Sequence, residues 1–168
     1  MESALCRLDF TPLPKGTIRT DGQRFSYAPM HVLLRYKQER ANPARDYLHC
    51  VLHCVFRHMY LHAPVEKQWW SLACDMVVED LIASLHLRAA AVSREAEQQA
   101  VLAGFREQVR PFTAEKLYRY FLDHALPRGG RHHRGPAQGA QTAEPGEAGL
   151  RRLPQKIGSI TISVGCVA

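Results

Sequence analysis

The chain has 168 residues, of which 46% are hydrophobic, and it carries a formal net charge of +6. Residues 127–156 hold six basic and two acidic side chains, which gives +4 there and leaves only +2 for the rest of the chain. This near-neutral remainder argues against a nucleic-acid-binding face. No apolar run approaches the ~20 residues of a membrane-spanning helix, so we expect no membrane segment.

The cellular compartment is indicated by the N-terminus and by the cysteines. The first residues, Met1-Glu2-Ser3-Ala4, lack the basic region and following apolar run of a secretory signal. The five cysteines contain no Cys-x-x-Cys pair. We therefore expect a cytoplasmic protein whose thiols are reduced.

The first predicted elements are a hairpin and two helices. Two short β-favouring runs flank Asp21-Gly22, a dipeptide typical of hairpin turns, and predict a hairpin over residues 16–27. Pro29 suits the first turn of a helix, predicted over 29–38. Asn42 as N-cap, followed by Pro43, predicts a second helix over 43–61.

Three more helices follow from apolar residues at helical spacing. They are predicted over 65–86, over 94–108 with Ser93 as the cap, and over 114–124. The predicted fold class is therefore mainly α, with a small N-terminal β-hairpin.

The composition changes after residue 126. Residues 127–156 contain six of the eleven glycines, four of the ten prolines and no Val, Ile, Phe, Tyr or Trp. Such a segment cannot bury enough apolar surface to offset the entropy of ordering, so we predict a folded domain over 1–126 and a disordered tail over 127–168. The last twelve residues alternate as a strand does, at Ile160, Ile162 and Val164, but without an expected pairing partner.

A candidate metal site lies on the helix predicted over 43–61. His49 and His53 are four residues apart and so share one face of the helix, where both imidazoles can reach one ion. The next helix carries Asp75 and Glu79 in an otherwise apolar stretch, and buried carboxylates need a cation or an imidazole as partner. We predict a three-ligand zinc site formed by His49, His53 and Asp75.

Other assignments of these side chains stay open. Glu79 or His58 is an alternative third ligand, although His58 reaches the site only if its helix ends early, and no glycine favours such a break. The carboxylates of the second helix alternatively bond to His49, His53 or Arg57 without any metal. Cys50 is most simply a small core residue, and no catalytic or cofactor-binding residue is assigned.

The segments Arg45–His58 and Trp70–Glu79 resemble a bacterial, zincin-like metallopeptidase domain that usually precedes a von Willebrand factor A-like (VWA-like) domain. In that family the helix reads His-Glu-x-x-His-x-x-x-x-His, and the next helix carries a Trp and an Ala-x-Asp motif. His49, His53 and His58 match the three histidines, and Ala73 and Asp75 match the second motif. The resemblance covers roughly residues 16–124 and implies zinc, a peptide substrate, and a VWA-like domain or an associated ATPase as partner.

The chain departs from that family at its centre. Cys50 stands where the family has the glutamate that acts as general base, which implies a metal-binding pseudoenzyme with weak or no peptidase activity. The alternative is a non-catalytic helical interaction module that partners a VWA-like domain or an ATPase. The sequence contains no Asp-x-Ser-x-Ser motif of a VWA-like domain. A reading-frame shift near residue 126 is our hypothesis for this difference.

Overall fold

The computed structural model describes residues 8–60, 64–125 and 164–166. Its helices and strands are β1 (Asp9–Pro12), β2 (Ile18–Thr20), β3 (Arg24–Tyr27), α2 (Pro29–Gln38), α3 (Asn42–Val55), α4 (Lys67–Ser84), the 3₁₀ turn η1 (Arg88–Ala90), α5 (Glu95–Gln108), α6 (Ala114–Ala125) and β4 (Val164–Cys166). The described residues are mainly α-helical with a small sheet, which confirms the predicted fold class. Of the disordered tail predicted over 127–168, only residues 164–166 are described, as strand β4, and the prediction for the other residues lies outside the described part of the chain.

The predicted hairpin is formed by β2 and β3, which pair antiparallel. Its turn is closed by the Asp21 carboxylate, which accepts hydrogen bonds from the backbone N–H groups of Gln23 (2.9 Å) and Arg24 (2.7 Å). Gly22 in this turn has a φ of +89°, a conformation that L side chains rarely adopt. The Asp-Gly dipeptide therefore supplies both the turn's acceptor and its left-handed residue.

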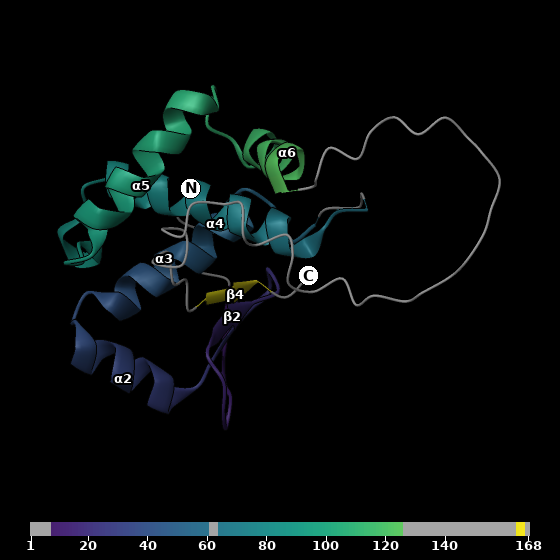
Figure 1. The fold of residues 1–168 in the computed structure, drawn as a ribbon. Helices are drawn as coiled ribbons and strands as arrows, with labels where there is room; N and C mark the ends of the chain where they lie inside the picture. Colours follow the sequence, from purple (N-terminus) through teal and green to yellow (C-terminus); the bar gives the residue numbers. More distant parts are fainter. Residues whose placement is uncertain (1–7, 61–63, 126–163, 167–168) are drawn as a thin grey trace, which may run out of the picture.

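Two further strands complete a sheet of order β1-β3-β2-β4. β1 pairs in parallel with β3, and the sequence did not predict it. β4 pairs in parallel with β2, so that Ile18 lies opposite Val164 and Thr20 opposite Cys166 (Figure 1). The expectation that the C-terminal strand has no partner is therefore wrong, because the hairpin leaves one edge of β2 open to pairing.

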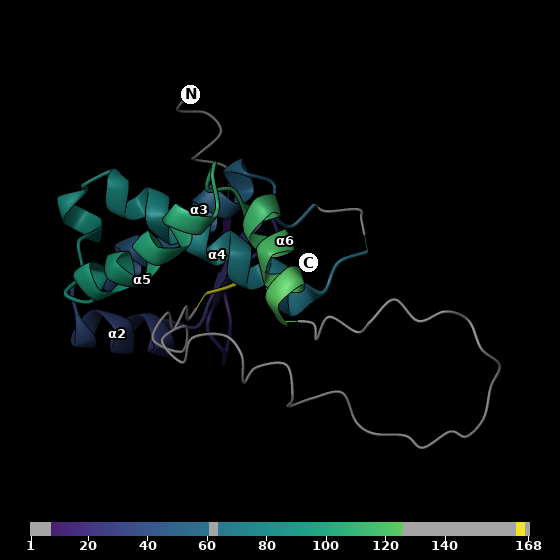
Figure 2. The same ribbon diagram turned by 45° about the horizontal axis from the view of Figure 1, so that its top comes forward.

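Helix α4 is central among the helices. It packs against α3 on one side and against α5 and α6 on the other (Figures 1 and 2). The main hydrophobic core lies between α4, α5 and α6 and consists of Ala73, Met76, Leu102, Phe105, Val109, Leu117 and Phe121. Burying each large member stabilises the fold by about 1.5–3 kcal/mol, so this core fixes α4, which carries Asp75 and Glu79 of the candidate site.

Two predicted helix caps form tertiary contacts instead. The Asn42 side chain donates from Nδ2 to the carbonyl oxygen of Arg35 (3.2 Å), and α3 has no side-chain cap. Ser93 donates from its N–H to Oε1 of Glu39 (2.7 Å), and α5 likewise has no side-chain cap. In both places a partner on another part of the chain outcompetes the local capping bond. None of the described helices is long and apolar enough to cross a lipid bilayer.

Candidate metal centre

His49 and His53 form the centre of the site. Both lie on α3, both are only 1% exposed, and their Nε2 atoms are 2.9 Å apart. The spacing of four residues places one imidazole a helical turn above the other, so the two rings converge without any distortion of the helix. The predicted histidine pair is thus brought together by local structure alone.

Asp75, the third residue of the predicted ligand set, lies close to both imidazoles. Its Oδ1 lies 3.1 Å from Nε2 of His53 and 3.4 Å from Nε2 of His49. With zinc–ligand bonds of about 2.0 Å and tetrahedral angles, neighbouring ligand atoms are ~3.3 Å apart. The ligand atoms of His49, His53 and Asp75 are therefore spaced as in a tetrahedral metal site, and a metal ion could be held by these three side chains.

Glu79 binds the opposite nitrogen of His49. Its Oε1 lies 2.9 Å from Nδ1 of His49, while its Oε2 accepts a hydrogen bond from Nε of Arg45 (2.9 Å) and forms an ion pair with Nη2 of the same side chain at 2.8 Å. If Nδ1 donates to Glu79, the neutral tautomer of His49 leaves Nε2 free to bind a metal. Glu79 therefore contacts the nitrogen of His49 that faces away from Asp75, and it is not one of the three residues whose ligand atoms converge.

Arg45 is a residue of the site that the sequence analysis missed. It is 1% exposed, and its Nη1 also donates to the carbonyl oxygen of Ala90 (2.8 Å) and contacts Glu95 (2.5 Å). Residues 45, 49 and 53 follow one another at intervals of four, so they form a single row on α3. This spacing places Arg45 on the same face of the helix as the two histidines, and fully buried arginines are rare. Together these observations are the signal that could have identified Arg45 as part of the site.

The protonation of the site follows from burial and from these contacts. Burial acts to lower the pKa of His49, but the hydrogen bonds and charges of Asp75 and Glu79 outweigh it and raise that pKa to about 9. Burial lowers the pKa of His53, and the neighbouring charge of His49 adds to this effect. Burial would raise the pKa values of both carboxyl groups, but the contacts with the imidazoles lower them. The metal-free site therefore holds a positive charge between two carboxylates, which is the electrostatic setting of a cation site.

Helix α3 ends six residues earlier than the sequence predicted. Arg57 has a φ of 58°. Its N–H donates to the carbonyl oxygen of Cys54 (3.1 Å), and the N–H of His58 donates to the carbonyl oxygen of His53 (3.1 Å). These two bonds define a Schellman motif with Phe56 as the C-cap. The expectation that α3 would not break without a glycine is wrong, because an arginine occupies the left-handed position.

This early helix end turns His58 back towards His53. Nδ1 of His58 lies 3.3 Å from Nδ1 of His53, on the side of that ring opposite to Nε2. The backbone of His58 is held in turn by Trp70 on α4, whose indole N–H donates to the His58 carbonyl oxygen (3.1 Å). His58 thus supports His53 as Glu79 supports His49, and the structure does not bring it to the ligand triangle.

Cys50 lies on another face of α3. It is fully buried and belongs to a hydrophobic cluster with Ile18 and Phe25, which joins α3 to the sheet. The position that carries the general base in His-Glu-x-x-His helices is therefore filled by a thiol that packs against β2 and β3. This agrees with the prediction of a small core residue.

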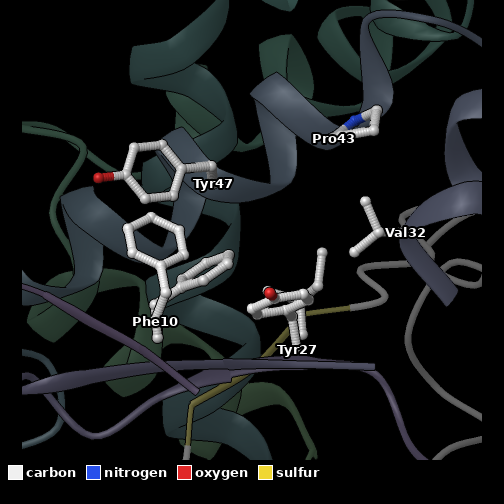
Figure 3. Close-up of a pocket in the computed structure, with 7 residues that line it drawn as sticks. Phe10, Tyr27, Val32, Pro43 and Tyr47 are labelled. Carbon is white, nitrogen blue, oxygen red and sulfur yellow. The ribbon is translucent and has the colours of Figure 1, made fainter. Parts of the chain in front are cut away.

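An apolar cavity of about 360 Å³ adjoins this cluster on the sheet side of α3. Figure 3 shows Phe10 against Tyr47 on one side and Val32 and Pro43 on the other, with Tyr27 below. The rings of Phe10 and Tyr47 are stacked, with centroids 5.9 Å apart. The described residues that line it include no histidine, cysteine, aspartate or glutamate, and none of them belongs to the metal triangle.

The chain as a whole matches a known protein family. The model of a family described as Putative metallopeptidase domain matches residues 1–165.

The chain belongs to this family.

Neither the curated proteins nor the solved structures contain a match to the chain. Membership of the Putative metallopeptidase domain family and the triangle of His49, His53 and Asp75 agree in pointing to a metal-dependent class of protein.

Proposed function

We propose that this protein is a zinc-binding, metallopeptidase-like domain with a degenerate catalytic site. The observation that carries the proposal is the triangle of two imidazole nitrogens and one carboxylate oxygen with sides of 2.9, 3.1 and 3.4 Å. Nitrogen and carboxylate donors in this number are typical of zinc sites that keep one position open. When bound, zinc would act there as a Lewis acid that polarises a carbonyl oxygen.

The degeneracy concerns proton transfer. General-base catalysis contributes about 10²–10⁴-fold to such reactions, and Cys50 replaces the residue that provides it. Glu79 is a poor substitute, because Arg45 and His49 already occupy both of its oxygens. Weak or absent peptidase activity follows from these two facts. A bacterial source and a cytoplasmic location stay expectations from the sequence.

A second candidate function is a non-catalytic interaction module, with a VWA-like domain or an associated ATPase as partner. The outer face of α2 favours this alternative, since Met30, Leu33 and Leu34 are 67%, 61% and 54% exposed. Contiguous exposed apolar side chains are typical of protein–protein interfaces. The two functions are compatible, because α2 does not contribute to the metal triangle.

Metal analysis of the purified protein tests the proposal. We expect stoichiometric zinc in the wild type, its loss in His49→Ala and His53→Ala, and its retention in the control His124→Ala, which changes an exposed histidine on α6. A casein assay on the same samples should show little or no hydrolysis. Absence of zinc from the wild type after incubation with excess metal would refute the metal site and leave the interaction module.

A further inference from the structure

A second cavity, of about 420 Å³, borders the metal centre. It lies between the end of α3, the C-terminal half of α4 and the start of α6, and His58 is one of its lining residues. The rings of His58 and His53 are 5.0 Å apart between centroids. A group bound in this cavity would therefore be separated from the metal triangle by a single imidazole.

The walls of the cavity are largely apolar. Phe56 lines it from the end of α3, Val77 and Leu81 from α4, and Phe112 from the segment before α6. Val77 and Leu81 are four residues apart and so lie on one face of their helix. Apolar walls of this kind accommodate the methylene stem of a lysine or arginine side chain as well as a purely apolar group.

Two carboxylates distinguish this cavity from an ordinary apolar pocket. Asp80 comes from α4 and Glu115 from the first turn of α6, and the described lining residues include no lysine or arginine. Arg106, which is outside the lining, places its Nη1 3.1 Å from Oδ1 of Asp80. Burial nevertheless raises the pKa of Asp80, although Arg106 acts to lower it. Oδ1 of Asp80 is buried and has no hydrogen-bond partner among the described residues, so a further cation or donor nearby would be favourable.

We propose that this cavity receives the basic side chain, arginine or lysine, of a peptide held at the metal centre. The apolar walls take the methylene stem, and the carboxylates of Asp80 and Glu115 take the charged end. The inference rests on the proposed function, because it names the class of peptide that the same site recognises.

The test uses the full chain loaded with zinc and three heptapeptides of alanine and glycine that differ only in one central residue, arginine, citrulline or glutamate. Citrulline keeps the shape of arginine and removes its charge. Dissociation constants and the position of binding are read from backbone amide shifts in NMR titrations. We expect the arginine peptide to bind at least tenfold more tightly than the citrulline peptide, with shifts concentrated at residues 112–115 and at Val77.

The variants identify the carboxylates responsible. Asp80→Asn and Glu115→Lys should each reduce the preference for arginine over citrulline at least fivefold. Asp123→Asn, which removes an exposed acid from the same helix as Glu115, should leave it unchanged. Glu115 is exposed, so its variant keeps the test valid even if Asp80→Asn fails to fold.

Three results would overturn the inference: equal binding of the arginine and citrulline peptides, a preference that survives both variants, or no binding of any peptide at millimolar concentration. Zinc content measured on the same samples distinguishes failure of this inference from failure of the proposed zinc-binding function. Bound zinc without an arginine preference removes only the inference. Absence of zinc removes the proposed function, and the peptide titration on the metal-free chain then decides whether the cavity binds a basic side chain by itself.

Discussion

Oε1 of Glu79 lies 2.9 Å from Nδ1 of His49, while Nε2 of the same ring faces His53 and Asp75. One imidazole therefore joins two parts of the site, the ligand triangle and a buried ion pair between Glu79 and Arg45. The contacts of α3 with α4 run in opposite order along the two helices, from Arg45 with Glu79 to His53 with Asp75. The metal centre is thus built on two antiparallel helices whose positions the ion pair helps to fix.

Glu79→Gln should weaken both functions of this residue. The apparent zinc affinity should fall about 10–100-fold, since outer partners of ligating histidines typically contribute this much. The metal-free protein should also lose stability on the order of 3 kcal/mol, because Arg45 would remain buried beside a neutral amide. Competition with a chromophoric chelator and urea unfolding measure the two effects. Glu97→Gln, at an exposed position on α5, should change neither, and an unaltered zinc affinity in Glu79→Gln would show that the contact is not functional.

Zinc affinity should rise with pH between 7 and 9. The pKa of His49 is raised to about 9, so the ring is protonated at pH 7 in the metal-free protein, and zinc must displace that proton. Each unit of pH below 9 should therefore reduce the apparent affinity by up to about tenfold. Chelator competition at several pH values gives the slope. A flat profile across this range would contradict the assignment of the proton to His49.

The stability of the metal-free protein should change with pH in the opposite sense. The pKa of His49 in the folded state, about 9, lies above the ordinary value of 6.5, so its protonation stabilises the fold. This contribution is fully present below pH 6.5 and is lost as the pH rises through about 9. Thermal unfolding in the presence of a chelator should show a lower Tm at pH 9.5 than at pH 6.5. The difference should shrink in His49→Ala.

Arg57→Gly should stabilise the protein. A non-glycine residue in the left-handed region costs about 1–2 kcal/mol, and glycine removes this cost at the expense of a more flexible unfolded chain. We expect a net gain of about 0.5–1 kcal/mol in urea unfolding. Arg57→Ala is the matched control, since it removes the same exposed side chain but keeps the strained backbone. If both variants have the same stability, the backbone at residue 57 is not under strain.

Cys50→Glu tests the missing base directly. Placing a carboxylate in the cluster of Ile18 and Phe25 should destabilise the protein by at least ~2 kcal/mol, because burying a charge among apolar side chains is unfavourable. Peptide hydrolysis should be measured at a temperature where the variant is still folded. Activity in Cys50→Glu that is absent from Cys50→Gln would show that the rest of the catalytic site is intact. If the wild type hydrolysed the peptide as fast as Cys50→Glu, the proposed degeneracy of the catalytic site would be contradicted.

Much of the helical framework could be predicted from the sequence. The hairpin follows from Asp21-Gly22, and the helices follow from apolar residues at helical spacing, because both signals are local. The pairing of β4 with β2 was not predictable in this way, since it joins residues that are more than 140 positions apart. Ser93 illustrates the same limit, because its bond to Glu39 replaces the cap that its local sequence favours.

The sequence by itself determined that the two histidines of the candidate site converge. Four residues make about one helical turn, so His49 and His53 must converge wherever their helix lies. The tertiary structure alone decided the roles of the surrounding groups. Asp75 reaches the pair, and Glu79 its far side, only because the core between α4, α5 and α6 fixes the position of α4. His58 returns to His53 only because Arg57 accepts a left-handed conformation, which a tertiary bond from Trp70 to the His58 backbone helps to hold.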